Sequence, residues 1–196
     1  LTDTDRDGGH TTLGDPGSTH AVVTRHSFRP WHVWVFGAGH VGRALILSLA
    51  PLPFDVTWAD PRPEAFPGAM PQNVTGFVGD PLEVVAEAPE GSLAFIMSHS
   101  HALDLQIADA ALRNPAIAHV GVIGSATKRA RFERRLRDAG VDNARVEAMI
   151  CPIGIGGIRS KLPAAIAVSV AAQLITLDEA LSASATHGIL PARNAG

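Results

Sequence analysis

Short runs of large apolar residues alternate along the chain with segments whose apolar positions recur at helical spacing. The clearest run, Trp31–Phe36, is rich in aromatic and β-branched residues and stops at a glycine. Residues 92–97 are continuously apolar after Ser92, which is typical of a strand buried on both faces. Three more short runs, at residues 55–60, 73–78 and 119–124, also have the pattern of strands. The pattern therefore predicts five strands.

The segments between and after these runs have the pattern of helices. Residues 40–50 end before Pro51, which cannot continue a helix, and residues 102–113 place leucine, isoleucine and alanine at helical spacing. Residues 128–139 form a basic segment that a glycine ends, and residues 163–177 form an apolar, alanine-rich one. Strands that alternate with helices of these lengths predict a parallel sheet covered by helices on both faces.

A glycine-rich turn joins the first predicted strand to the first predicted helix. Gly37, Gly39 and Gly42 form a G-x-G-x-x-G motif that contains His40, and Asp60 ends the next predicted strand. In dinucleotide-binding folds the first glycine makes the tight turn, the second lets the backbone approach a pyrophosphate, and the third packs helix against strand. The predicted fold class is therefore α/β, a Rossmann-type doubly wound, mostly parallel sheet with helices on both faces.

The residues after the second predicted strand leave the ligand of this turn open. Asp60 would accept a hydrogen bond from a ribose 2′-hydroxyl, whereas Arg62 would hold a phosphate. NAD, NADP and another phosphorylated ligand are all compatible with this pair. The glycines also satisfy the steric needs of the turn alone, so an empty or reused cleft is the competing interpretation.

The two ends of the chain differ in composition from the middle. Residues 1–29 contain few large apolar side chains, and residues 182–196 are small and polar. We expect flexible tails at both ends, the first a tail or linker remnant, around a Rossmann-type domain at residues 30–181. Because the chain starts with Leu1 and not with Met, we also expect it to be a piece of a longer protein.

Histidines follow the fourth predicted strand, at the position where open α/β sheets bind their ligands. His99 and His101 occupy this position, and Asp104 lies one helical turn further on. Two imidazoles and a carboxylate suit acid–base work or metal binding, but no third ligand is spaced to complete a stable metal site. In the alternative interpretation Ser100 caps the following helix and both histidines face solvent.

A cluster of cations follows the fifth predicted strand. Residues 128–137 hold six basic residues, Lys128 and Arg129 among them, and one acidic residue, which gives a local charge of +5 in a chain of net charge −3. Basic residues at a helix N-terminus oppose the helix dipole, so a bound anion or an acidic partner would account for them. A solvated helix face, with Phe132 on its buried side, is the alternative.

The only thiol of the chain, Cys151, opens a loop with three glycines, two prolines and two cations. Gly154 and Lys161 belong to this loop, and Pro163 suits the first turn of the helix that follows. The loop has the composition of an anion cradle. Cys151 is either an inert buried hydrophobe or a nucleophile or ligand, and the sequence leaves both open.

Composition narrows the class of protein. The chain has 196 residues, one Cys and no Tyr. A lone Cys excludes an internal disulfide and a thiolate-rich zinc site, and it indicates a reducing, cytoplasmic location. Near-neutral charge with 5% aromatic residues argues against a nucleic-acid binder. No apolar run approaches the length of a membrane span, so no membrane segment is expected.

Two longer motifs resemble a known family. Residues 98–104, Ser-His-Ser-His-Ala-Leu-Asp, and residues 121–132, with Gly-Ser-Ala-Thr-Lys-Arg, are similar to the Rossmann domain of the xanthine dehydrogenase accessory protein family, XdhC. Residues 35–44, 58–62 and 151–167 match it in the same order. The resemblance implies a chaperone that binds molybdenum cofactor (molybdopterin), protects it, assists its sulfuration with a cysteine desulfurase and delivers it to a xanthine dehydrogenase apoenzyme, rather than a catalyst.

The chain departs from this family in two places. Relatives usually carry an N-terminal domain with its own glycine-rich motif, which residues 1–29 do not match, and Leu162 and Ala165 stand where relatives often have more polar residues.

The resemblance also implies where the cofactor binds. The expected cofactor-binding residues are Gly37, Gly39, His40, Gly42, Asp60, Arg62, His99, His101, Ser125, Lys128, Arg129, Cys151, Gly154 and Lys161.

Two other functions stay as alternatives. The glycine motif suits an NAD(P)-binding oxidoreductase or a regulatory nucleotide-binding domain, although the length leaves no substrate domain and the missing Tyr removes a Tyr-Lys mechanism. A docking module would use Arg134 and Arg135 to meet an acidic face of a partner. A homodimer is left open, and no nucleic-acid or membrane partner is expected.

Overall fold

The computed structural model describes residues 10–13, 21–24 and 31–187, with the side chains of residues 10–13, 21–24 and 181–187 excepted. The chain divides into two units, residues 1–30 and 31–196. In the first unit, strands β1 (His10–Leu13) and β2 (Ala21–Thr24) pair antiparallel, with His10 opposite Thr24. These strands fall within the range expected to be a tail or linker remnant. The other residues of that range, and residues 188–196, lie outside the described residues.

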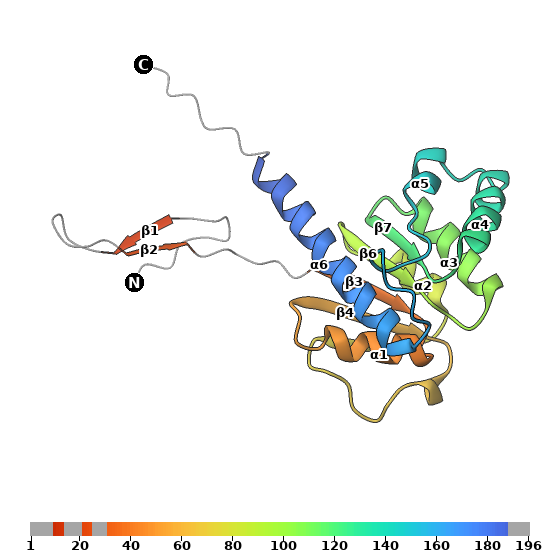
Figure 1. Ribbon diagram of the computed structural model, residues 1–196, viewed down its shortest axis with the longest axis horizontal. Coiled ribbons are helices and arrows are strands. Elements are labelled where there is room, and N and C mark those ends of the chain that lie inside the picture. Colours follow the sequence, from red (N-terminus) through yellow and green to blue (C-terminus); the bar gives the residue numbers. More distant parts are fainter. Residues whose placement is uncertain (1–9, 14–20, 25–30, 188–196) are drawn as a thin grey trace, which may run out of the picture. The chain divides into compact units, whose positions relative to one another are not determined.

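The second unit contains the predicted sheet (Figure 1). Every neighbouring pair of its five strands is parallel, and the strand order is β5-β4-β3-β6-β7. The doubly wound, parallel Rossmann-type prediction is confirmed. The strands are β3 (Trp31–Phe36), β4 (Phe54–Asp60), β5 (Val74–Val78), β6 (Ser92–Ile96) and β7 (Ile117–Val122).

The central strand β3 shows how the sheet separates two cores. Trp34 and Phe36 pack on one face, whereas Val33 and Val35 pack on the other, as the period of a strand requires. The first face is covered by α2 (Pro81–Ala86), α3 (His101–Arg113), α4 (Ala126–Asp138) and α5 (Asn143–Ala148), and the second by α1 (His40–Leu49) and α6 (Pro163–His187).

Two short helices were not predicted. Both α2 and α5 have six residues, fewer than two helical turns, so their apolar positions show no helical period. Each begins at an aspartate whose side chain accepts a backbone N–H: Asp80 from Leu82, and Asp142 from Arg145. A 3₁₀ turn at Pro63–Ala65 was also not predicted.

Helix α6 corrects the expectation about apolar segments. It continues to His187, through residues 182–187 of the predicted C-terminal tail. Its residues Pro163–Ala180, with mean hydropathy 1.2, are long and apolar enough to cross a membrane by length and composition. Val170 and Leu174 pack in the core that α6 shares with α1, but only 28% of the span Pro163–Ala180 is buried, and Val168 is exposed.

Candidate functional site

The strand order has its switch point between β3 and β6, where open α/β sheets form their ligand-binding crevice at the carboxyl ends of the strands. The chain runs from β3 outward to β4 and β5, then returns to the other side of β3 as β6. Helices α1, α3 and α4 follow the carboxyl ends of β3, β6 and β7, so their N-terminal backbone N–H groups face the same edge. Such N-termini attract anions through unpaired N–H groups and the helix dipole.

The glycine turn between β3 and α1 has the geometry that its motif predicts. Gly37 has a φ of +118°, and a Cβ there would lie 2.5 Å from the Met97 carbonyl oxygen. A Cβ at Gly42 would overlap the Gly37 carbonyl oxygen. A Cβ at Gly39 would meet no atom within 4 Å, so open space adjoins the N-terminus of α1, where His40 is also exposed. The first and third glycines are thus required because a side chain at either would clash with the backbone, whereas the second faces the crevice.

Asp60 is closed to a ribose in this arrangement. Its Oδ1 accepts from the backbone N and Nε of Arg62, at 3.0 and 2.9 Å, and its Oδ2 accepts from Arg62 Nη2 and from the Ala38 backbone N, at 2.8 and 2.7 Å. Burial favours the neutral acid, but the bonds from Arg62 and Ala38 outweigh it and lower the pKa of Asp60. Both oxygens are fully engaged, so Asp60 anchors the glycine turn.

The two histidines after β6 face solvent. Ser100 caps α3 by accepting from the Leu103 backbone N at 3.4 Å, as the alternative interpretation of this segment predicts. His101 Nδ1 lies 2.8 Å from Arg131 Nη2. Within the described residues, His99 has no hydrogen-bond or ion-pair partner. Among the described residues, the His99 imidazole is therefore without a partner, whereas Nδ1 of His101 is engaged by Arg131.

Asp104 does not join these histidines. It is fully buried, with Oδ1 accepting from the Ser98 backbone N at 3.0 Å and Oδ2 bound to Lys128 Nζ at 2.6 Å. Lys128 Nζ also donates to the Ile123 carbonyl at 2.8 Å and lies 5.1 Å from the centre of the Phe132 ring. This buried ion pair links the loops after β6 and β7. Lys128 thus points into the protein rather than into the crevice.

Ser125 and Arg129 occupy the start of α4. Ser125 Oγ caps the helix by accepting from the Lys128 backbone N at 3.3 Å. Arg129 binds Glu133 at 2.6 Å and donates to the carbonyls of Glu147 and Cys151, at 3.2 and 3.4 Å. The structure therefore places Ser125 at the crevice edge but commits much of the Arg129 guanidinium to contacts within the fold.

The loop after Cys151 is divided in the same way. Cys151 is buried, and burial raises the pKa of its thiol despite the nearby Lys128 and Arg129, so the neutral thiol is the form present at pH 7. The backbone N–H of Gly154 donates to Gln173 Oε1 at 2.8 Å. Lys161 is exposed, and no carboxylate contacts it in the part of the chain that the structure describes.

The predicted residues therefore form two sets. One set is exposed at the strand-end edge and its loops: Gly39, His40, His99, His101, Ser125 and Lys161. The other lies inside the fold or is held by it: Gly37, Gly42, Asp60, Arg62, Lys128, Arg129, Cys151 and Gly154. Arg131, beside His101, belongs to the predicted cation cluster at residues 128–137 but was not among the expected cofactor-binding residues. Among the described residues, no three His, Cys, Asp or Glu side chains are grouped to hold a metal.

Residues 33–174 match the model of the XdhC Rossmann domain. The chain belongs to the XdhC Rossmann domain family. The resemblance expected from the motifs at residues 98–104 and 121–132 is thereby confirmed.

Relatives of this XdhC domain are longer than the chain itself. It is 31% identical over 176 residues to the uncharacterized protein YqeB of Escherichia coli (strain K12), a match that covers 87% of this chain and 31% of YqeB. Its fold resembles a crystal structure described as a xanthine dehydrogenase from Bacillus halodurans, with a TM-score of 0.67 and 21% identity over 80% of this chain and 46% of the other. The chain thus spans less than half the length of either protein.

Proposed function

We propose that this XdhC domain binds molybdenum cofactor as cargo at the strand-end crevice and serves a xanthine dehydrogenase apoenzyme as an accessory protein. The observation that carries the proposal is the open space at Gly39, beside the N-terminus of α1, in a domain of this family. Neither α1 nor α4 has an acidic residue in its first turn, so both N-termini keep their attraction for an anion. A molybdopterin carries phosphate, which suits such a position.

The donor set favours binding through the phosphate and pterin rather than through the metal. The described residues contain no group of three or more His, Cys, Asp or Glu side chains that could hold a metal ion. His40, His99 and Lys161 are exposed and supply hydrogen bonds and positive charge to an anionic, heteroaromatic ligand. The molybdenum would then stay accessible to the enzymes that modify and receive the cofactor.

The state of Asp60 supports this proposal over the dinucleotide alternative. The 2′-hydroxyl of an NAD ribose would have to compete with Arg62, which contacts both carboxylate oxygens of Asp60. Charge-assisted bidentate pairs of this kind are among the stronger side-chain hydrogen bonds. The arrangement therefore disfavours a ribose diol, whereas a ligand that binds through its phosphate without a ribose at Asp60 needs no such exchange.

Cys151 has no role in sulfur transfer in this proposal. A buried, neutral thiol is a poor nucleophile and a poor sulfur acceptor. In this proposal a partner cysteine desulfurase supplies the sulfur, and this chain presents the bound cofactor to it.

A charge placed at Gly39 tests the site directly. Gly39→Glu adds a carboxylate in open space without a steric clash, and Gly68→Glu makes the same change at another glycine with open space around it. In anaerobic equilibrium binding with molybdenum cofactor, we expect Gly39→Glu to weaken binding at least about 10-fold, or 1.4 kcal/mol, and Gly68→Glu to bind like the original chain. Equal binding by both variants contradicts the site. No saturable binding, even with a family N-terminal domain attached, contradicts the function.

A further inference from the structure

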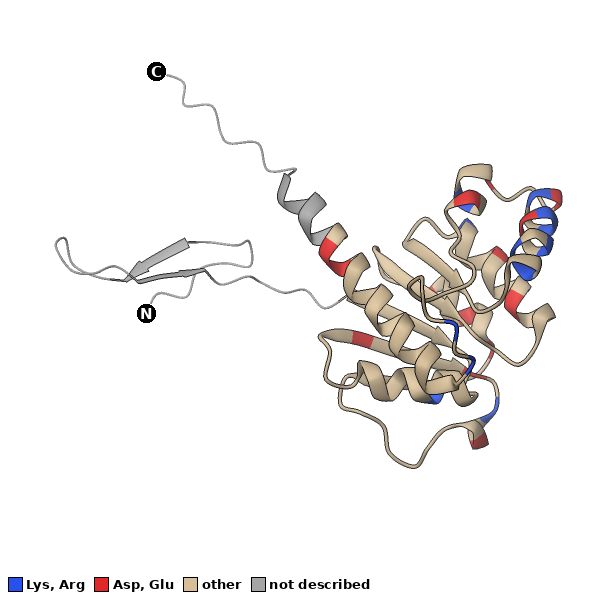
Figure 2. Ribbon diagram, in the orientation of Figure 1, with Lys and Arg blue, Asp and Glu red and all other residues tan. Residues whose placement is uncertain are grey.

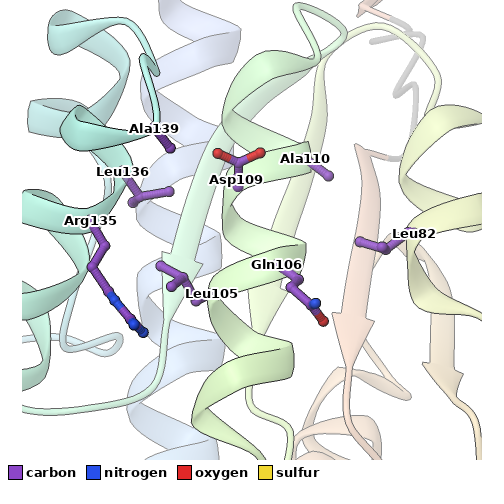
Figure 3. A pocket seen from close by; sticks show the side chains of 8 residues that line it. All are labelled: Leu82, Leu105, Gln106, Asp109, Ala110, Arg135, Leu136 and Ala139. Carbon is purple, nitrogen blue, oxygen red and sulfur yellow. The ribbon is translucent and has the colours of Figure 1, made fainter.

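A groove of about 360 Å³ lies between α2, α3 and α4, away from the crevice (Figure 3). Its floor is apolar, formed by Leu82, Leu105 and Leu136, and Figure 3 shows Leu105 and Leu136 in the space between α3 and α4. Leu136 is ten residues beyond the start of α4, which is about 15 Å along the helix. The groove is therefore a surface separate from the cofactor site.

The two edges of α4 differ in how their cations are neutralised. On the edge away from the groove, Glu133 accepts from Arg129 at 2.6 Å and forms an ion pair with Arg137 at 3.6 Å, and Arg137 also lies 3.9 Å from Glu147. Arg135 lines the groove, and Arg131 lies one helical turn before it, with its Nη2 2.8 Å from His101 Nδ1. No carboxylate in the described ranges pairs with either of them. Figure 2 shows the resulting concentration of basic residues on α4.

The acidic residue in the groove does not cancel this charge. Asp109 is held by Arg113 of the same helix through two contacts, at 2.9 and 3.1 Å. Arg113 also donates to the Ala139 carbonyl at 2.7 Å and so ties the ends of α3 and α4 together. The Asp109–Arg113 pair has no net charge, so the rim of the groove keeps the positive charge of Arg135 and, one turn away, of Arg131.

We propose that this groove binds an acidic amphipathic helix of a partner protein. An apolar floor between two helices takes the leucine-type face of a third helix, with anchors at positions i, i+3, i+4 and i+7. Carboxylates beside those anchors would meet Arg131 and Arg135, whose spacing of four residues matches that of neighbouring side chains on a helix. The charge of the rim selects an acidic partner, and the leucine floor favours a protein over a nucleic acid.

A synthetic peptide supplies the probe. We would use a fluorescein-labelled amphipathic peptide of about five helical turns, with leucine on one face and glutamate beside it, and an otherwise identical peptide with lysine in place of glutamate. Fluorescence anisotropy should show binding of the glutamate peptide at least about 10-fold tighter than that of the lysine peptide, with affinity that falls as salt is added. Backbone amide NMR shifts should change at Leu105 and Leu136.

Two charge reversals on one helix provide the matched comparison. Arg135→Glu acts at the groove, whereas Arg134→Glu makes the same change at an exposed residue that does not line it. We expect Arg135→Glu to weaken binding of the glutamate peptide at least about five-fold and Arg134→Glu less than about two-fold, in line with the local character of interface charges. Equal losses, equal affinity for both peptides, NMR shifts at the crevice alone, or tighter binding of an oligonucleotide of matched charge would each overturn the proposal.

Discussion

The buried pair Lys128–Asp104 gives the sharpest prediction about the fold that supports the crevice. Asp104 is fully buried and Lys128 is 7% exposed. Lys128→Met removes the ammonium and leaves the carboxylate with one donor, the Ser98 backbone N–H. Removal of one partner of a buried pair costs about 3–5 kcal/mol. At about 2–4 °C per kcal/mol for a chain of this size, the midpoint of thermal unfolding should fall by about 6–20 °C.

A second substitution distinguishes lost charge balance from lost packing. Asp104→Asn keeps an oxygen that accepts from Ser98, so the double variant Lys128→Met/Asp104→Asn should recover most of the loss because it has no unpaired buried charge. Urea unfolding followed by tryptophan fluorescence gives the four free energies of the cycle. A loss below about 1 kcal/mol for Lys128→Met, or additive single losses, would refute the reasoning.

Three further predictions concern separate residues. Gly42→Ala should lower the free energy of unfolding by about 1–3 kcal/mol, because its Cβ would overlap the Gly37 carbonyl oxygen, whereas Gly68→Ala should change it by less than about 0.5 kcal/mol in the same urea titration. Burial and the charge of Arg145 lower the pKa of His119 below its value in the unfolded chain, which is about 6.5. The free energy of unfolding should therefore be highest above this pH and fall as the pH drops below it, and His119→Gln should flatten that dependence. Cys151 should react with a thiol reagent much more slowly in the folded chain than in urea, and equal rates would contradict its burial.

The sheet could be predicted from the sequence because its determinants are local. The runs at residues 31–36 and 92–97 are too apolar to form a surface helix or loop, either of which needs polar side chains toward solvent. The turn after the first run has steric requirements that only glycine meets. The short helices α2 and α5 were not predicted, because six residues do not establish a helical period. Strands β1 and β2 were also not predicted, since residues 1–29 contain few large apolar side chains.

The position of the candidate site follows from the sequence more readily than the roles of its side chains. Topology alone brings the loops after β3, β6 and β7 to one edge. The direction of each side chain depends on partners distant in sequence. Lys128, expected to be a surface cation, is buried because it pairs with Asp104, which lies 24 residues away in the chain. The sequence Asp60-Pro61-Arg62 is compatible with a free ribose acceptor and with a closed ion pair, and only the fold distinguishes them.

The preference of the crevice for its ligand is the central claim of this account. Parallel anaerobic titrations of the same purified chain, one with molybdenum cofactor and one with NADH, test it directly, with pterin and nicotinamide fluorescence as the signals. We expect saturable binding of one cofactor per chain and no saturable response to NADH, because Arg62 occupies the ribose acceptor Asp60. Tight, saturable binding of NADH without binding of the cofactor would contradict the account.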